Sequence, residues 1–120
     1  MAKYKDLTRA GEQLRDMLHE VIHKSFPENR FNSIPTITID PRMQCAGKAW
    51  WGCIDIAKWF YVGATKLQLE RLLAHEYIHT GLGLHLRSHL KLRSEMKARG
   101  YKNFSTKELH QIMGRYKERR

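Results

Sequence analysis

Two histidines four residues apart, His75 and His79, constrain this chain more than any other feature of its sequence. On an α-helix, side chains four residues apart lie one turn above each other on one face, so both imidazoles can bind the same ion. Glu76 follows His75 directly and lies to the side, where it can reach a water held by that ion without binding the ion itself. This H-E-x-x-H spacing predicts a zinc-binding helix.

The residues around the two histidines carry the start and stop signals of a complete helix. Thr65-Lys-Leu-Gln68 predicts a capping box that opens the helix, and Gly81 and Gly83 predict its end one turn after His79. Leucines between these signals supply an apolar face for packing. This context favours a metal site over a surface helix that carries two histidines by chance.

A catalytic zinc site needs a third protein ligand and an open fourth position. His85 is our first choice, because it completes the spacing H-E-x-x-H-x5-H. His89, four residues further on, is the alternative third ligand. If residues 85 to 99 are helical, the two histidines share one face. The histidine that does not bind would then lie close behind the one that does.

The length and composition predict one domain, residues 1–120. Of its 120 residues, 42% are hydrophobic, which suits a modest core. No run of about 18 apolar residues occurs, and the N-terminal Met-Ala-Lys-Tyr-Lys-Asp lacks the apolar stretch of a signal peptide. We therefore expect a cytoplasmic monomer with no membrane segment.

Positive charge is concentrated in the last third of the chain. The net charge is +10, and from Leu86 onward 11 Lys and Arg stand against 3 Glu. DNA is a natural partner for such a segment, because cations that neutralise phosphates release condensed counterions. The alternative is a solvated surface that only aids solubility. The residues expected to bind DNA without sequence preference, and so to hold the protein at the nucleoid, are Arg87, Lys91, Arg93, Lys97, Arg99 and Lys102.

Hydrophobic periodicity and turn signals predict an α+β fold with a small three-stranded antiparallel or mixed sheet. The first expected elements are a helix from Asp6 to about Phe26 and a strand in Ile34–Asp40. A hairpin or short meander follows, from Gln44 to Trp51 and from Ile54 to about Ala57 or beyond. After the histidine helix we expect a basic helix in Leu86–Arg99 closed by Gly100, and a last helix that opens at a second capping box, Ser105–Glu108.

An aromatic cluster precedes the histidine helix and consists of Trp50, Trp51, Trp59, Phe60 and Tyr61. Aromatic side chains beside a basic surface can stack on unpaired bases. Neighbours on a strand point to opposite faces, so at most one of Trp50 and Trp51 is expected at the surface. Core packing is the expected role of most of the cluster.

Five segments follow the N-terminal helix in a characteristic order: Asp40-Pro-Arg-Met43, Ala46-Gly-Lys-Ala-Trp-Trp-Gly52, Ile54-Asp-Ile56, Leu72-Leu-Ala-His-Glu-Tyr-Ile-His79 and Met96-Lys-Ala-Arg-Gly100. In this order they resemble the SprT-like (Spartan-type) metalloprotease domain, a minimal zincin. The resemblance spans about residues 5–101 and leaves 102–120 as a basic C-terminal helix. The chain departs from many relatives in lacking a zinc ribbon and in the residues after the third histidine. The spacing of Gly83 and His85 is closer to that of Wss1-like relatives.

The resemblance implies a zinc endopeptidase that acts on DNA-associated proteins, as in the repair of DNA–protein crosslinks. His75, His79 and either His85 or His89 would bind Zn²⁺, and Glu76 would act as general base for the attack of a zinc-bound water on a peptide bond. The substrate is expected to lie extended along an edge strand in the Met43–Trp51 region. Tyr61, Tyr101 and the non-ligand histidine are candidates for stabilising the oxyanion.

Two other functions fit the same residues. One is a nucleic-acid-binding module with a structural zinc, in which all four histidines, His75, His79, His85 and His89, close the metal shell. The other is a regulatory metalloprotease of the phage type that cleaves a repressor, with the basic segment serving a partner protein.

Overall fold

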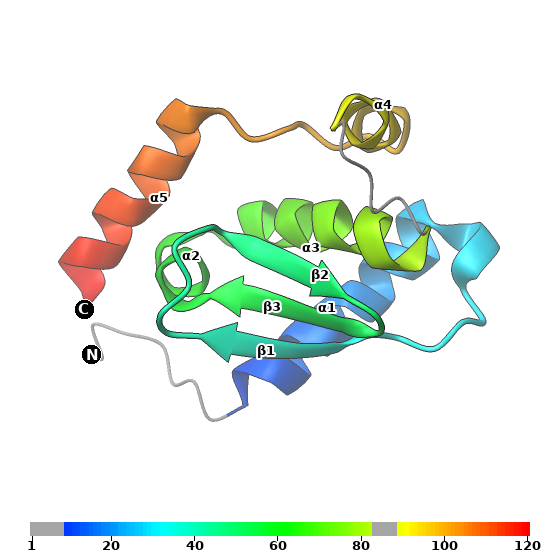
Figure 1. Cartoon of the computed structure of the whole chain (residues 1–120), viewed down its shortest axis with the longest axis horizontal. Coiled ribbons are helices and arrows are strands. Elements are labelled where there is room, and N and C mark those ends of the chain that lie inside the picture. The colour runs from blue at the N-terminus through cyan, green and yellow to red at the C-terminus, as the bar shows by residue number, and fades with distance from the viewer. Residues whose placement is uncertain (1–8, 83–88) are drawn as a thin grey trace.

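The structure, a computed structural model, describes residues 9–82 and 89–120. Its elements are α1 (Ala10–Ser25), the short 3-10 helix η1 (Pro27–Asn29), β1 (Thr36–Asp40), β2 (Gly47–Trp50), β3 (Cys53–Ala57), α2 (Lys58–Gly63), α3 (Lys66–Gly81), α4 (Leu90–Ala98) and α5 (Thr106–Arg119) (Figure 1). The predicted α+β fold is confirmed. Within the two described ranges, no helix is long and apolar enough to cross a membrane.

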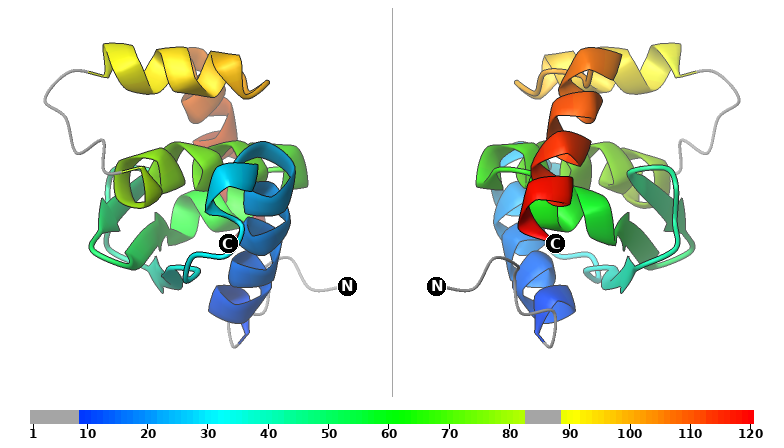
Figure 2. Two further views of the ribbon diagram at one scale, coloured as in Figure 1. Left: turned by 90° about the vertical axis from the view of Figure 1, so that its right-hand side faces the viewer. Right: turned by 90° about the vertical axis from the view of Figure 1, so that its left-hand side faces the viewer.

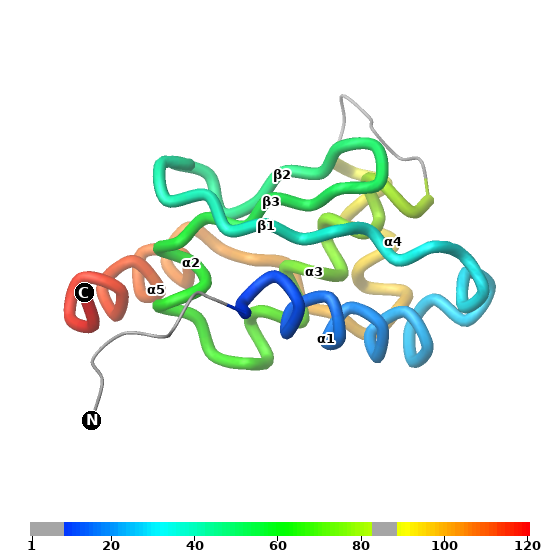
Figure 3. Tube along the Cα trace, turned by 90° about the horizontal axis from the view of Figure 1, so that it is seen from below, coloured from blue at the N-terminus to red at the C-terminus, as the bar shows by residue number. Residues whose placement is uncertain are grey.

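The sheet is mixed, with strand order β1-β3-β2. β3 runs parallel to β1, with Ile37 opposite Ile54, and antiparallel to β2, with Lys48 opposite Asp55. The β2–β3 turn passes through Gly52, whose φ of 69° suits a residue without a Cβ. α1 and α3 lie against the sheet, as Figure 3 shows from below. β2 is therefore an edge strand beside α3.

The core lies between the sheet and these two helices. The apolar stripe predicted for the N-terminal helix is buried, including Leu14, Leu18 and Ile22. Phe26 packs edge-on against Tyr77 of α3, with ring centroids 5.0 Å apart. The Asn29 amide of η1 donates 3.0 Å to the Tyr77 hydroxyl and 3.1 Å to the Gly81 carbonyl, which ties the end of α3 to the end of α1.

α2 was not anticipated from the sequence. The β-forming residues after Ala57 suggested that the strand could continue, but Lys58–Gly63 form a short helix. In that conformation Phe60, Tyr61 and Val62 are all buried. Tertiary packing overrides local β propensity here, because a strand would direct alternate side chains away from the core.

α5 lies across α2, as the right-hand view of Figure 2 shows. Arg115 and Arg119 donate 2.7 Å and 2.8 Å to the carbonyls of Gly63 and Val62 at the end of α2. Half of the predicted Ser105–Glu108 capping box forms: the Ser105 hydroxyl accepts from the Glu108 N–H. The Glu108 carboxylate instead pairs with Arg71 of α3. The C-terminal helix is thus an integral part of the fold.

Candidate metal centre

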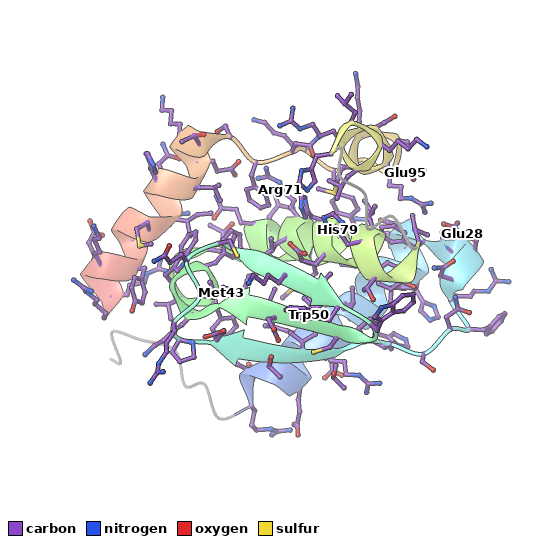
Figure 4. The ribbon with its side chains drawn as sticks, viewed as in Figure 1. Glu28, Met43, Trp50, Arg71, His79 and Glu95 are labelled. Carbon is purple, nitrogen blue, oxygen red and sulfur yellow. The ribbon has the colours of Figure 1, made fainter. Side chains whose placement is uncertain are left out.

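Three imidazoles meet between α3 and α4. His75 and His79 lie one turn apart on the same face of α3, as the sequence predicted, with ring centroids 5.3 Å apart. The centroid of the His89 ring lies 6.0 Å from that of His75 and 5.4 Å from that of His79. One nitrogen from each ring lies within 4.8 Å of the others, and this is the one such group of potential ligands among residues 9–82 and 89–120. Figure 4 shows His79 on the side of α3 that faces α4.

The donor set fits a zinc ion. Three nitrogens bound tetrahedrally at 2.0–2.1 Å from zinc lie about 3.4 Å from one another, so small side-chain adjustments would complete the site. Burial, followed by the neighbouring His79 and His89, lowers the pKa of His75 from 6.5 to about 4. His75 is therefore neutral at neutral pH, which is the form that binds metals.

Glu76 lies beside the three histidines at the bottom of the site. Its side chain is 5% exposed, and its Oε2 lies 3.9 Å from the His75 Nε2. Burial raises the pKa of Glu76 from 4.5 to about 8. A bound cation would favour the ionised carboxylate. A Cβ at Gly47 would lie 3.0 Å from the Glu76 Oε2, so the absence of a side chain there makes room for the carboxylate.

The histidines and Glu76 open into a cleft of about 640 Å³. β2 forms one side of the cleft, α3 forms its floor, and α4 together with the segment leading to α5 forms the other side. Lining residues from these parts are Gly47, Ala49, Leu72, Leu92, Arg93 and Phe104. A main chain laid along β2 would pass directly by the three imidazoles.

Thr80 connects the histidine helix to the edge strand. Its hydroxyl donates 2.6 Å to the Trp50 carbonyl and accepts a 3.3 Å bond from the Gly52 N–H. Both partners lie at the β2–β3 turn. The residue after His79 therefore holds the end of β2 in place against α3.

α4 brings His89 to the site through contacts along the helix and just beyond its far end. Leu92 and Met96 are buried, and Arg99 just beyond the helix pairs with Glu28 at 2.5 Å and with Glu95 at 2.9 Å. The Arg99 guanidinium also donates 2.7 Å to the Ser25 carbonyl and lies 4.3 Å from the centroid of the Phe26 ring. α4 begins at Leu90, and His89 is its N-cap residue. The first three residues of the predicted Leu86–Arg99 helix lie outside the described residues.

The residues predicted to bind DNA divide into three groups. Arg87 lies outside the described residues, as does His85. Lys91, Arg93, Lys97 and Lys102 are exposed. Arg99 differs from them, because its side chain is only 18% exposed and is engaged by two carboxylates. Its position fits an anchor of α4 rather than a phosphate contact.

Several aromatic residues lie elsewhere than the sequence suggested. Trp50 and Trp51 are both exposed, at 53% and 89%, because Trp51 belongs to the turn and not to the strand. Neither candidate tyrosine lines the cleft. The Tyr61 hydroxyl donates a 3.4 Å hydrogen bond to the Gln13 side-chain oxygen, and the hydroxyls of Tyr101 and Ser25 are hydrogen-bonded to each other at 2.7 Å.

Sequence reasoning missed several residues of the site: Thr80, Arg71, Asn103, Phe104 and Leu109. Arg71 precedes His75 by four residues and so shares its face of the helix, which was an available signal. Asn103 and Phe104 lie far from the motif in sequence. Only the packing of the C-terminal segment brings them to the cleft.

Comparisons with known proteins give no relative for this chain: no family model, no curated protein and no solved structure matches it.

Proposed function

We propose that this chain is a zinc-dependent endopeptidase of the SprT-like kind. The observation that carries the proposal is the convergence of His75, His79 and His89 beside the buried Glu76 in a cleft next to an edge strand. Three imidazole donors, an adjacent carboxylate and room for a peptide are the parts that a zinc peptidase requires.

In this proposal His75, His79 and His89 would hold the metal. His85, the first choice from the sequence, lies outside the described residues. When bound there, zinc would supply a water of lowered pKa and would polarise the peptide carbonyl. The open side of the site faces the cleft, where the substrate would enter.

Glu76 is the general base in this proposal. Its carboxylate would accept a proton from the attacking water and donate it to the amine that leaves. Gly47 leaves room for this carboxylate at the bottom of the cleft. The free edge of β2 would orient an extended peptide through main-chain hydrogen bonds, and Thr80 would keep that edge in register with α3.

The cleft favours a catalytic role over a purely structural zinc. A structural site is closed by four protein ligands and needs neither a buried acid nor a cavity beside it. Here Glu76 is buried next to the histidines, and the cleft reaches them from the side of β2. The four-histidine alternative requires His85, which lies outside the described residues.

We further propose that substrates are proteins bound to DNA. Lys91, Arg93 and Lys97 are exposed on α4, and Arg93 also lines the cleft. DNA held by these cations would bring its bound proteins close to the three histidines. A repressor would satisfy the same geometry, so the regulatory protease is a special case of this substrate class.

The Glu76→Gln substitution tests the proposal. The amide is nearly isosteric but cannot accept the water's proton, so hydrolysis of a DNA-binding protein should fall by about 100- to 10,000-fold. Elemental analysis should still find about one zinc per chain, as the intact histidines require. Undiminished cleavage by a variant free of contaminating protease would overturn the role of Glu76. Loss of zinc from this variant would make Glu76 a ligand instead.

A further inference from the structure

Four apolar residues from three parts of the chain line the cleft: Leu72 of α3, Leu92 of α4, and Phe104 and Leu109 near the start of α5. We call these four residues the Phe104 subsite. Leu72 precedes His75 by three residues, which is about 4.5 Å along the helix. That distance corresponds to little more than one residue of an extended chain, so the subsite lies one or two residues from the metal.

Phe104 is held firmly in this wall. Its ring packs edge-on against Phe60, with centroids 5.5 Å apart, and the guanidinium carbon of Arg71 lies 4.2 Å from its centroid. Arg71 also donates to the carbonyls of Lys102 and Asn103, at 2.9 Å and 3.1 Å, and forms a double hydrogen bond with Glu108. These contacts hold the backbone just before residue 104 and the Glu108 side chain just after it, so this part of the cleft is formed before any ligand binds.

The charge of Arg71 is not available to a ligand. The residue is 7% exposed, and the Glu108 carboxylate neutralises it. Figure 4 shows Arg71 on the side of α3 that faces the segment between α4 and α5. Within the described residues, the charged groups that line the cleft are Lys48, Glu76 and Arg93, of which Lys48 and Arg93 are exposed and Glu76 lies beside the histidines. A charged side chain in the Phe104 subsite would lose water without gaining a partner.

We infer that the Phe104 subsite binds an apolar side chain of the peptide substrate, one of about the size of leucine or phenylalanine. The inference rests on the proposed peptidase function and names its substrate class. Gly47 lies beside Glu76, and the Trp50 carbonyl lies beside Thr80, so β2 and α3 advance in the same direction. In a peptide extended along β2, alternate side chains point toward α3. One of them meets the subsite, and the C-terminal segment 102–109 thereby selects the substrate.

Peptide binding tests the inference without requiring hydrolysis. The Glu76→Gln chain serves as the common background, and the ligands are dye-labelled extended peptides scanned one position at a time with Leu, Phe, Ser, Lys and Glu. We expect one position at which Leu or Phe binds at least about 10-fold tighter than Ser, Lys or Glu, the scale on which apolar pockets discriminate. Leu109→Asn and Phe104→Ala should each reduce that preference to below about 3-fold. Leu67→Ala, at an exposed site of α3 that does not line the cleft, should leave it unchanged.

The outcomes separate the subsite from the peptidase. Cleavage without an apolar preference would overturn the subsite alone. A wild type that shows the preference but never hydrolyses a peptide would overturn the peptidase alone. No binding of any peptide, or a preference that survives Leu109→Asn, would overturn the inference. Phe104 packs on Phe60, so Phe104→Ala can unfold the chain. Thermal melting is therefore measured for each variant. If Phe104→Ala fails to fold, the result for Leu109→Asn decides the test.

Discussion

α3 and α4 supply the three histidines in different ways. α3 carries His75 and His79, whose separation follows from helical geometry alone. α4 contributes His89 at its N-terminus, and the helix is held in place by the buried Leu92 and Met96 and by Arg99 just beyond its other end. The relative position of two of the histidines is therefore a local property of one helix, and the position of the third depends on how two helices pack.

This difference predicts different sensitivities. A substitution on α3 that preserves the helix leaves the spacing of its two histidines intact. A substitution that releases α4 moves the His89 nitrogen even when His89 itself is unchanged, because Arg99 lies ten residues away at the other end of the helix. The predictions below run from the largest expected effect to the smallest, and the substitutions of the histidines and of Arg99 test this contrast.

Removing the ligands should have the largest effect. His79→Ala and His89→Ala should each weaken zinc binding by more than about 100-fold, beyond the range for residues that only support a ligand. Competition with a chromophoric chelator measures this affinity, and His23→Ala, exposed on α1, is the control. If His85→Ala weakens zinc binding and His89→Ala does not, His85 is the third ligand. Comparable losses in both would favour the four-histidine structural zinc.

The anchor of α3 to α5 should matter next. Glu108→Gln should lower the free energy of unfolding by about 2 kcal/mol at neutral pH, because it leaves the Arg71 guanidinium buried without a carboxylate. The cost should fall below the 3–5 kcal/mol of a fully buried pair, since 19% of the Glu108 side chain is exposed. Urea unfolding measures it, with the exposed Glu118→Gln on the same helix as control.

The effect of Glu108→Gln should depend on pH in a defined direction. Hydrogen bonds from Arg71 hold the pKa of Glu108 below its usual 4.5. The carboxylate therefore stabilises the fold fully above the unfolded pKa, and the contribution is lost as pH falls through the lowered folded pKa. The stabilities of wild type and variant should converge in acid. A constant difference down to about pH 2 would rule out the ion pair as its cause.

Releasing α4 should have a smaller effect on zinc than removing a ligand. Arg99→Gln should weaken zinc binding by about 10-fold, the low end for a residue that orients a ligand. Lys97→Gln, exposed on the same helix, should have no effect. An unchanged affinity in Arg99→Gln would mean that Leu92 and Met96 alone hold His89 in position.

The exposed cations should have the smallest effect on the site and a measurable effect on DNA. Wild type should bind DNA with a slope of log affinity against log salt of roughly −3 to −4, which corresponds to about 4 phosphates. Replacing Lys91, Lys97 and Lys102 with Gln should flatten the slope by about one unit for each phosphate that is no longer neutralised, and should leave zinc affinity unchanged. The control is a variant that carries both Lys24→Gln and Lys66→Gln. If the wild type does not bind DNA even at low salt, the exposed cations form only a solvated surface and the DNA-binding proposal is wrong.

The sequence by itself determined α3 and half of the site. The capping box at Thr65 forms as predicted, with the Gln68 N–H donating 3.2 Å to the Thr65 hydroxyl and the Gln68 side chain accepting at 2.9 Å. The helix ends at Gly81, and the His75–His79 pair stands on one face. The predicted N-terminal helix and first strand also agree with α1 and β1 in the described residues. Each of these features depends on residues within about four positions of one another or on simple periodicity.

Tertiary structure decided everything that depends on distant parts of the chain. Lys58–Gly63 are helical because the core accepts Phe60 and Val62 in that form, although their local preference is for a strand. His89 lies beside His75 because α4 packs on the rest of the molecule through Leu92, Met96 and Arg99. Phe104 lines the cleft, where it packs against Phe60 and Arg71. Local patterns specify which face of an element is apolar, but not which other element will cover it. That choice depends on how all the faces fit together at once, and it placed His89 beside His75 and Phe104 at the cleft.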